Sequence, residues 1–156
     1  MQPITPCLWF DTQAEEAAEF YISLFPDSKI TDISRWPDGT ERSGDVLTVA
    51  FELNGSPYTA LNGGPEFTFT EAISLQVHCE DTEQFDTLWD RLAEGGEISQ
   101  CGWLKDRYGL SWQVIPAGFM ELMQDPDPER ASRAMQAMMK MQKLDIDTLR
   151  AAADAS

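Results

Sequence analysis

The chain has 156 residues, 42% of them hydrophobic and 24% charged, which is typical of a globular protein with one core or two small repeats sharing a core. With 27 acidic and 11 basic residues it carries a net charge of −16, and no basic patch offsets the repulsion of a nucleic-acid backbone. No apolar run reaches the ~18 residues of a membrane span, and the N-terminal segment MQPITPCLWFD lacks the pattern of a signal peptide, so we expect a cytoplasmic protein that binds neither nucleic acid nor membranes.

The first half of the chain predicts one helix among four strands. Alternating or β-branched runs indicate strands at residues 4–10, 28–36, 46–53 and 57–62. Asp11 or Thr12 is the expected cap of a helix that Pro26 ends. The apolar face of this helix consists of Ala14, Ala17, Ala18, Tyr21, Ile22 and Phe25. The predicted turns are Pro37-Asp38-Gly39-Thr40 and Asn54-Gly55, and Gly63-Gly64-Pro65 then interrupts the pattern.

The same order of elements begins again in the second half. A strand at residues 72–80 precedes a helix capped by Asp81 or Thr82, and Gly95-Gly96 ends that helix before a strand at residues 97–104. The apolar side of the helix consists of Phe85, Leu88, Trp89 and Leu92. A shift of 71 positions superimposes Ala14, Ala17, Ala18 and Tyr21 on these four, as expected for a duplicated βαβββ unit.

A hairpin completes the second half of the chain, with its turn at Asp106-Arg107-Tyr108-Gly109. We interpret Asp106 and Arg107 as part of a solvated turn rather than as a catalytic pair. Residues alternate between two faces in the second arm, with Leu110, Trp112 and Val114 on an apolar face and Ser111, Gln113 and Ile115 on the other. Gln113 is therefore a candidate pocket residue.

After Pro116 the pattern becomes helical, at residues 119–123, 128–143 and 146–153. The middle segment places Ala131, Met135, Met138 and Met139 near one stripe. Methionine stripes usually belong to a core or a subunit contact, because the flexible thioether fills irregular gaps. We expect this stripe to dock onto the second subunit of a homodimer.

The predicted fold class is therefore α+β, with duplicated βαβββ units forming a cupped mixed sheet, followed by C-terminal helices. We expect one domain over residues 1–156, with repeat one at about 1–64, repeat two at about 70–116 and a helical tail at 117–156. The helices would cover one face of the sheets, and the other, curved face would enclose a cavity.

Several segments of the chain together resemble one family: ITPCLWFDTQAEEAAEFYISLFPDSKI, LNGGPEFTFTEAISLQV, CGWLKDRYGLSWQVIP and AMMKMQKLDIDTL. They resemble the PhnB-like branch of the vicinal oxygen chelate superfamily, which includes glyoxalase I, extradiol dioxygenases and bleomycin resistance proteins. Members of this branch often carry the label 3-demethylubiquinone-9 3-methyltransferase. The resemblance covers nearly the whole chain and implies the glyoxalase-like fold.

Metal-dependent members of the superfamily hold a divalent ion with four inward side chains, typically His, Glu or Gln. Carried over by register, these positions fall at Thr5 (or Ile4), at Tyr58 or Ala60, at Ser74 and at Gln113. Only Gln113 could coordinate, and a single neutral amide beside a hydroxyl group binds a divalent ion too weakly. We therefore expect no metal ion, and we expect no other cofactor.

The residues left for a pocket are mostly neutral. The expected polar groups are Ser74, Gln76 and Gln113, and the expected aromatic walls are Trp9, Phe67, Phe69, Trp103 and Tyr108, although core packing is the alternative for each ring. His78 shares a strand face with Ser74 and Gln76 but stands at the strand's end, so it is either a hydrogen-bonded histidine at the rim or a weak candidate for a general base.

The three cysteines, Cys7, Cys79 and Cys101, form no CxxC pair and indicate neither a disulfide framework nor a zinc site. We expect buried thiols, since free cysteine is often interior. Cys101 is also a weak candidate for a nucleophile, because no basic partner lies near it in sequence and only one histidine exists to activate it.

Three functions follow from these residues. The first is a metal-free protein that binds a small, partly aromatic molecule, as the resemblance to bleomycin resistance proteins implies. The second is an enzyme: a lyase, isomerase, dioxygenase-type or methyl-transfer protein. Methyl transfer of the usual kind needs a glycine-rich turn that opens a helix, whereas Gly63-Gly64 is followed by proline and aromatic residues. The third is an interaction module that docks a partner through its acidic surface and methionine-rich tail.

Overall fold

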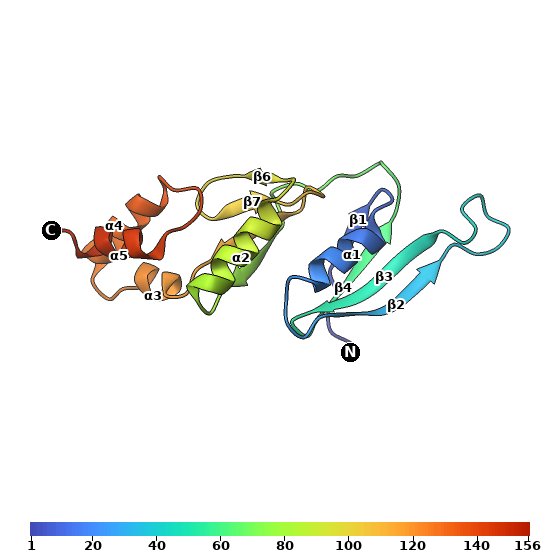
Figure 1. Cartoon of the computed structure of the whole chain (residues 1–156), viewed down its shortest axis with the longest axis horizontal. Helices are drawn as coiled ribbons and strands as arrows, with labels where there is room; N and C mark the ends of the chain where they lie inside the picture. Colours follow the sequence, from blue (N-terminus) through green and yellow to red (C-terminus); the bar gives the residue numbers. More distant parts are fainter. The chain divides into compact units, whose positions relative to one another are not determined.

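Two four-stranded sheets with the same internal order form the framework of the chain (Figure 1). The computed structural model describes all residues, 1–156, and divides them into two compact units, residues 1–69 and 70–156. The strand order is β1-β4-β3-β2 in the first unit and β5-β8-β7-β6 in the second. This repetition confirms the predicted α+β class and the duplicated βαβββ arrangement.

The first unit consists of β1 (Cys7–Phe10), α1 (Ala14–Ile22), β2 (Lys29–Arg35), β3 (Val46–Leu53) and β4 (Ser56–Asn62). β1 runs parallel to β4, and β3 lies antiparallel to both β4 and β2. The helix covers one face of this sheet, where Val49, Phe51 and Ala60 are buried. The strands form where they were predicted, although β1 begins three residues later than expected.

The second unit begins with β5 (Ser74–His78), α2 (Thr82–Ala93), β6 (Glu97–Ile98), β7 (Trp103–Lys105) and β8 (Ser111–Ile115). β5 runs parallel to β8, while β7 lies antiparallel to both β8 and β6. Asp81 caps α2 by accepting a hydrogen bond from the backbone N–H of Gln84 at 2.7 Å, as the sequence predicts.

The two helices bury matching positions. The buried residues of α1 are Ala14, Ala17, Ala18 and Tyr21, and those of α2 are Phe85, Leu88, Trp89 and Leu92. These are the eight positions that the 71-residue shift superimposes, so the periodicity identified the correct face of both helices. The side chains at matching positions differ greatly in volume, from alanine in the first unit to rings and leucines in the second.

The start of α1 differs from the prediction. The residue before the helix is Gln13, whose side chain makes no capping hydrogen bond, and neither Asp11 nor Thr12 is the cap. The side chain of Asn62 takes this role from the end of β4: its Oδ1 accepts the backbone N–H of Ala14 at 2.8 Å, and its Nδ2 donates to the carbonyl oxygen of Val46 at 3.0 Å. Asn62 is 4% exposed, so it joins the helix start to two strands within the core.

The strand predicted over residues 97–104 is divided into β6 and β7 by a turn. Cys101 and Gly102 both adopt positive φ angles, 58° and 84°, which an extended strand does not allow. Their backbone N–H groups donate to the carbonyl oxygens of Met141 and Gln142, each at 2.8 Å. The turn is therefore held by a segment that lies about forty residues later in the chain.

The tail contains α3 (Phe119–Met123), α4 (Pro128–Met138) and α5 (Ile146–Asp154), so α4 ends five residues earlier than predicted. These helices share a small core of Leu122, Ala134, Leu149 and Ala153. Met138 packs against this core, whereas Met135 and Met139 are 49% and 64% exposed. The predicted methionine stripe is thus divided between the core and the surface. None of the helices is both long and apolar enough to cross a membrane.

Candidate polar site on the second sheet

The second sheet has one apolar face and one polar face. α2 packs against β7 and β8, where Leu104, Trp112 and Val114 are nearly inaccessible to solvent. The residues between these point the opposite way, because side chains alternate along a strand. Strand register places Gln76 opposite Gln113 and Gln113 opposite Trp103, so these three side chains form a row across β5, β8 and β7.

Hydrogen bonds connect the predicted polar residues on this face. Gln113 Nε2 donates to Ser74 Oγ at 2.8 Å, and Gln76 Nε2 lies 3.4 Å from Gln113 Oε1. Ser74 and Gln113 are half-buried, while Gln76 is exposed. The three groups thus form one connected neutral array beside the half-buried ring of Trp103. Such an array can donate and accept hydrogen bonds at the same time.

Two further residues belong to the same face and were not among the predicted pocket residues, although the sequence had already placed Ser111 on this face. Ser111 lies in register with both Ser74 and Lys105, and its hydroxyl oxygen is buried without a hydrogen-bond partner. Lys105 Nζ lies 2.5 Å from Glu71 Oε1. The hydrogen bond from Lys105 lowers the pKa of Glu71, and Glu71 in turn raises the pKa of Lys105. The signal available in sequence was the alternation Ser111, Gln113 along one strand.

Asp106 organises the turn between β7 and β8. Its Oδ1 accepts the backbone N–H groups of Tyr108 and Leu110 at 2.8 and 3.1 Å, and its Oδ2 accepts the indole N–H of Trp112 at 2.8 Å. Asp106 is only 2% exposed, so the prediction of a solvated Asp106 is wrong. Arg107 does lie at the surface, with its guanidinium group 3.9 Å from Glu94. Tyr108 is half-buried within this turn.

The aromatic residues predicted in the first unit contact opposite faces of β1. Trp9 donates its indole N–H to the carbonyl oxygen of Gly64 at 2.9 Å, and its ring packs edge-on against Phe67 with centroids 4.9 Å apart. Phe69 instead packs against buried Phe10, with centroids 5.4 Å apart. Phe67 and Phe69 therefore do not line one common wall, since Trp9 and Phe10 point in opposite directions.

The glycine pair after β4 supports this tryptophan rather than opening a helix. A Cβ atom at Gly63 would lie 2.3 Å from the Trp9 ring, so only glycine fits there without a shift. No helix follows Gly63-Gly64, because residues 63–73 contain only turns and irregular backbone. This arrangement lacks the phosphate-binding geometry of a glycine-rich strand-to-helix turn.

No hydrogen bond joins either candidate catalytic residue, His78 or Cys101, to this array. His78 is exposed at the last position of β5, opposite Ile115. Cys101 is half-buried in the turn that the 141–142 segment holds. Of the other thiols, Cys79 is buried as predicted, whereas Cys7 is exposed and the prediction of a buried thiol there is wrong.

The strand register also corrects the expected metal-ligand positions in the first unit. Tyr58 and Ala60 lie opposite Phe51 and Val49, which are on the face covered by α1, and Thr5 precedes the first residue of β1. The residues of β1 and β4 on the other face are Cys7, Trp9, Thr59 and Leu61. No group of three or more His, Cys, Asp or Glu side chains is placed to hold a metal ion. The side chains at the expected ligand positions therefore do not fit a divalent ion of the kind that metal-dependent relatives hold.

Comparison with known proteins places this fold in a family. The sequence model described as 3-demethylubiquinone-9 3-methyltransferase matches residues 2–115. The chain belongs to this family. A PhnB protein from Bacillus cereus, also described by that activity, shares 40% sequence identity with a TM-score of 0.69, covering 74% of this chain and all 100% of its own. A comparison with curated proteins gives no significant match.

More distant structures share the fold of this 3-demethylubiquinone-9 3-methyltransferase family member. A protein from Pseudomonas aeruginosa is 17% identical with a TM-score of 0.63, covering 74% of this chain and 98% of its own. The fosfomycin resistance protein FosX from Mesorhizobium loti is 12% identical with a TM-score of 0.55, covering 79% of this chain and 97% of its own. These two similarities show that the chain shares the glyoxalase-like fold, and they indicate no particular activity.

Proposed function

We propose that this chain is a small-molecule-binding protein that holds no metal ion, and that the polar face of its second sheet orients the ligand. The observation that carries the proposal is the connected array of Ser74, Gln113 and Gln76 beside Trp103. Binding sites commonly combine apolar walls with a few oriented polar groups. We expect the protein to act in the cytoplasm as a homodimer.

The array favours a neutral or zwitterionic ligand with a flat apolar part. Amide and hydroxyl groups satisfy donors and acceptors without adding charge, and the indole ring offers a broad surface for stacking. Lys105 adds one positive charge on the same face, but Glu71 neutralises it at 2.5 Å. A ligand with a net charge would therefore have no free opposite charge to bind in this row.

The test is a screen of small aromatic amides and heterocycles that measures the melting temperature with and without added Zn²⁺, Ni²⁺ or Mn²⁺. A ligand at a hundred times its Kd stabilises the folded state by about 2.7 kcal/mol, whereas the metal ions are expected to change nothing. Gln113→Leu should abolish most of the ligand's effect, because it removes the central member of the array. Gln136→Leu, at an exposed position of α4, is the matched control.

Two results would contradict the proposal. One is a full ligand-induced shift in the Gln113→Leu protein, which would mean that the array does not contact the ligand. The other is elemental analysis showing one tightly bound divalent ion per chain. That second result would favour an enzyme of the oxygen-chelate type.

An enzyme of the same family is the second candidate, because the matching family is described as a methyltransferase. In that case S-adenosylmethionine should bind the purified protein in calorimetry, and His78→Ala should slow a reaction that the unmodified protein catalyses. We expect no binding of this methyl donor, since the backbone after Gly63-Gly64 forms no helix start that could hold it.

A further inference from the structure

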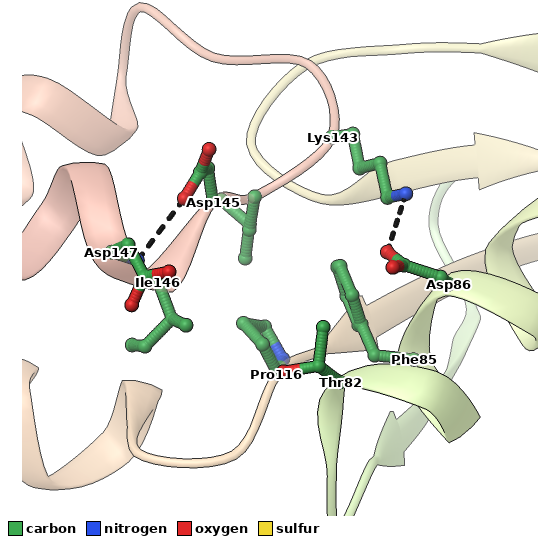
Figure 2. Close-up of a pocket in the computed structure, with 9 residues that line it drawn as sticks. Thr82, Phe85, Asp86, Pro116, Lys143, Asp145, Ile146 and Asp147 are labelled. Carbon is green, nitrogen blue, oxygen red and sulfur yellow. Dashed lines mark hydrogen bonds and ion pairs between the residues drawn. The ribbon is translucent and has the colours of Figure 1, made fainter.

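A cavity of about 450 Å³ lies within the second unit, away from the polar sheet face (Figure 2). It is formed where the first turn of α2 and Pro116 meet the segment that joins α4 to α5. Six of its nine lining residues, Pro116 and residues 143–147, follow Ile115, where the family match ends. Its size suits a small organic molecule. A ligand bound here would be separate from the ligand proposed for the polar sheet face.

The lining combines apolar surface with an excess of negative charge. Phe85 and Pro116 are buried, and Ile146 is half-buried, so these side chains offer an apolar wall. Three carboxylates, Asp86, Asp145 and Asp147, and one cation, Lys143, line it, and only Asp86 pairs with Lys143. Asp145 accepts the first N–H groups of α5, and Asp147 lies near Arg150, so Asp86 is the carboxylate that a ligand's ammonium group would meet. With the net charge of −16 on the whole chain, this lining attracts cations and repels anions.

Lys143 shows how an ammonium group fits at this place. Its Nζ lies 2.7 Å from Asp86 Oδ1 and 5.4 Å from the centre of the Phe85 ring. A carboxylate combined with an aromatic face is a common way in which proteins hold an ammonium group. Figure 2 shows the lysine reaching across from the tail segment to α2, above the Phe85 ring.

A ligand can easily replace Lys143 in its ion pair with Asp86. The side chains of Lys143 and Asp86 are 38% and 52% exposed, so solvent screens their attraction and the pair contributes little to stability. The lysine stem is flexible and can turn toward solvent when another cation takes its position. The cost of opening this position to a ligand is therefore small.

We propose that this cavity binds a small organic ammonium compound. The charged group of the ligand replaces the Lys143 ammonium between Asp86 and the Phe85 ring, and its apolar part packs against Pro116 and Ile146. Lys143 competes with the ligand, so it sets the affinity of the site without contacting the ligand's charge.

Calorimetric titration of the full chain with 2-phenylethylammonium chloride tests the proposal, with neutral 2-phenylethanol as the comparison at equal ionic strength. We expect saturable binding of the ammonium compound and binding of the alcohol that is about three- to fivefold weaker, since the ion pair with the partly exposed Asp86 is lost. Asp86→Asn should weaken ammonium binding by about the same factor. Lys143→Met should strengthen it several-fold, because the competing charge is removed while an apolar stem remains.

The control is Asp90→Asn, one helical turn further along α2 and outside the cavity, which removes the same charge and should change the affinity less than twofold. Circular dichroism and melting temperature confirm that each variant folds. The proposal is wrong if the unmodified chain shows no saturable heat, or if Asp90→Asn weakens binding as much as Asp86→Asn. Weaker binding by Lys143→Met would also overturn it, because Lys143 would then be part of the binding contact.

Discussion

The side chain of Asp106 accepts three hydrogen bonds within the turn between β7 and β8 and from the strand that follows it. Its carboxylate accepts two backbone N–H groups and the indole N–H of Trp112, and it is almost completely buried. A buried carboxylate is stable only when such donors replace the water it has lost. The turn geometry and the position of Trp112 beneath α2 therefore depend on the same side chain.

Asp106→Asn should lower the free energy of unfolding by about 2 to 3 kcal/mol, since one acceptor oxygen becomes a donor that faces other donors. Urea unfolding followed by tryptophan fluorescence measures this change. Asp90→Asn, at an exposed position, should shift the midpoint very little. Equal midpoints for the two variants would show that the buried hydrogen bonds of Asp106 contribute nothing.

The cysteines offer a second measurement at the residue scale. Burial, and to a smaller extent the charge of Asp81, raises the pKa of Cys79 to about 11. Partial burial also raises the pKa of Cys7, although most of this residue remains exposed to solvent. The thiolate is the reactive form, so at pH 8 only about one Cys79 thiol in a thousand is available, and that one is covered by the protein.

Iodoacetamide at pH 8 should therefore modify Cys7 long before Cys79, as peptide mass mapping over time would show. Rapid modification of Cys79 in the folded chain would contradict its buried position. The raised pKa also has a stability consequence. Because the unfolded thiol ionises first, the free energy of unfolding should fall as the pH rises from about 9 toward 11.

The sheet face toward which a side chain points was predictable where alternation along one strand decides it. Alternation along residues 110–115 placed Gln113 on the polar face, and the structure adds its contacts with Ser74 and Gln76. The burial of Asp106 was not predictable, since a turn sequence rich in charge gives no sign that Trp112 donates back to it. The metal-ligand positions predicted in β4, Tyr58 or Ala60, were one residue out of register. A shift of one residue moves a side chain to the opposite face of the sheet, here the face that α1 covers.

At the scale of elements, two glycines in the second unit have different functions. A Cβ at Gly96 would lie 2.0 Å from the carbonyl oxygen of Lys105, so the backbone just before β6 and the end of β7 approach each other too closely for a side chain. Gly109 has no atom near its Cβ position, but its φ is +85°. The first glycine is required by space and the second by backbone conformation.

Gly96→Ala should therefore destabilise the chain by about 3 kcal/mol or more, because backbone atoms must move. Gly109→Ala should cost about 1–2 kcal/mol, the strain of a left-handed alanine. Thermal unfolding of both variants under the same conditions measures the difference. The reverse order would show that β7 can shift to make room at Gly96.

Element boundaries were predictable where local sequence sets them and not where distant segments do. Asp81 caps α2 from the neighbouring position, and the prediction was correct. α1 begins after Gln13 because Asn62, almost fifty residues later, satisfies its first N–H group. The turn at Cys101 and Gly102 likewise depends on the carbonyl oxygens of Met141 and Gln142.

At the scale of the whole molecule, the expected homodimer would need a surface for self-association, and we expect exposed methionines to provide it. Met135 in α4 and Met139, the residue that follows this helix, lie one turn apart and are 49% and 64% exposed. We expect a second copy of the chain to cover them, since large exposed apolar side chains commonly mark interaction sites.

The double variant Met135→Glu and Met139→Glu should convert a dimer into a monomer, which light scattering after size-exclusion chromatography would detect. Gln136→Glu adds a charge to the same helix between these positions and should leave the dimer intact. A monomeric unmodified chain at high concentration would contradict the prediction, as would a dimer that survives both methionine substitutions.

The duplication was the whole-molecule property best predicted from sequence, because apolar spacing on a helix reports the buried face directly. The tail was predicted less well: α4 is shorter than expected, and its loop after Met139 supports the second sheet instead of extending the helix. Helical periodicity alone does not reveal such docking, since the partner backbone atoms carry no sequence signal.

The unequal volumes on the two helices mean that the repeats are no longer interchangeable parts. α1 presents three alanines to its sheet, whereas α2 presents phenylalanine, leucine and tryptophan at the matching positions. A chimaera carrying α2 in place of α1 would force bulky rings into space shaped for methyl groups, and the reciprocal graft would leave a void. Each helix is therefore fitted to its own sheet, and exchanging the two is expected to destabilise both units.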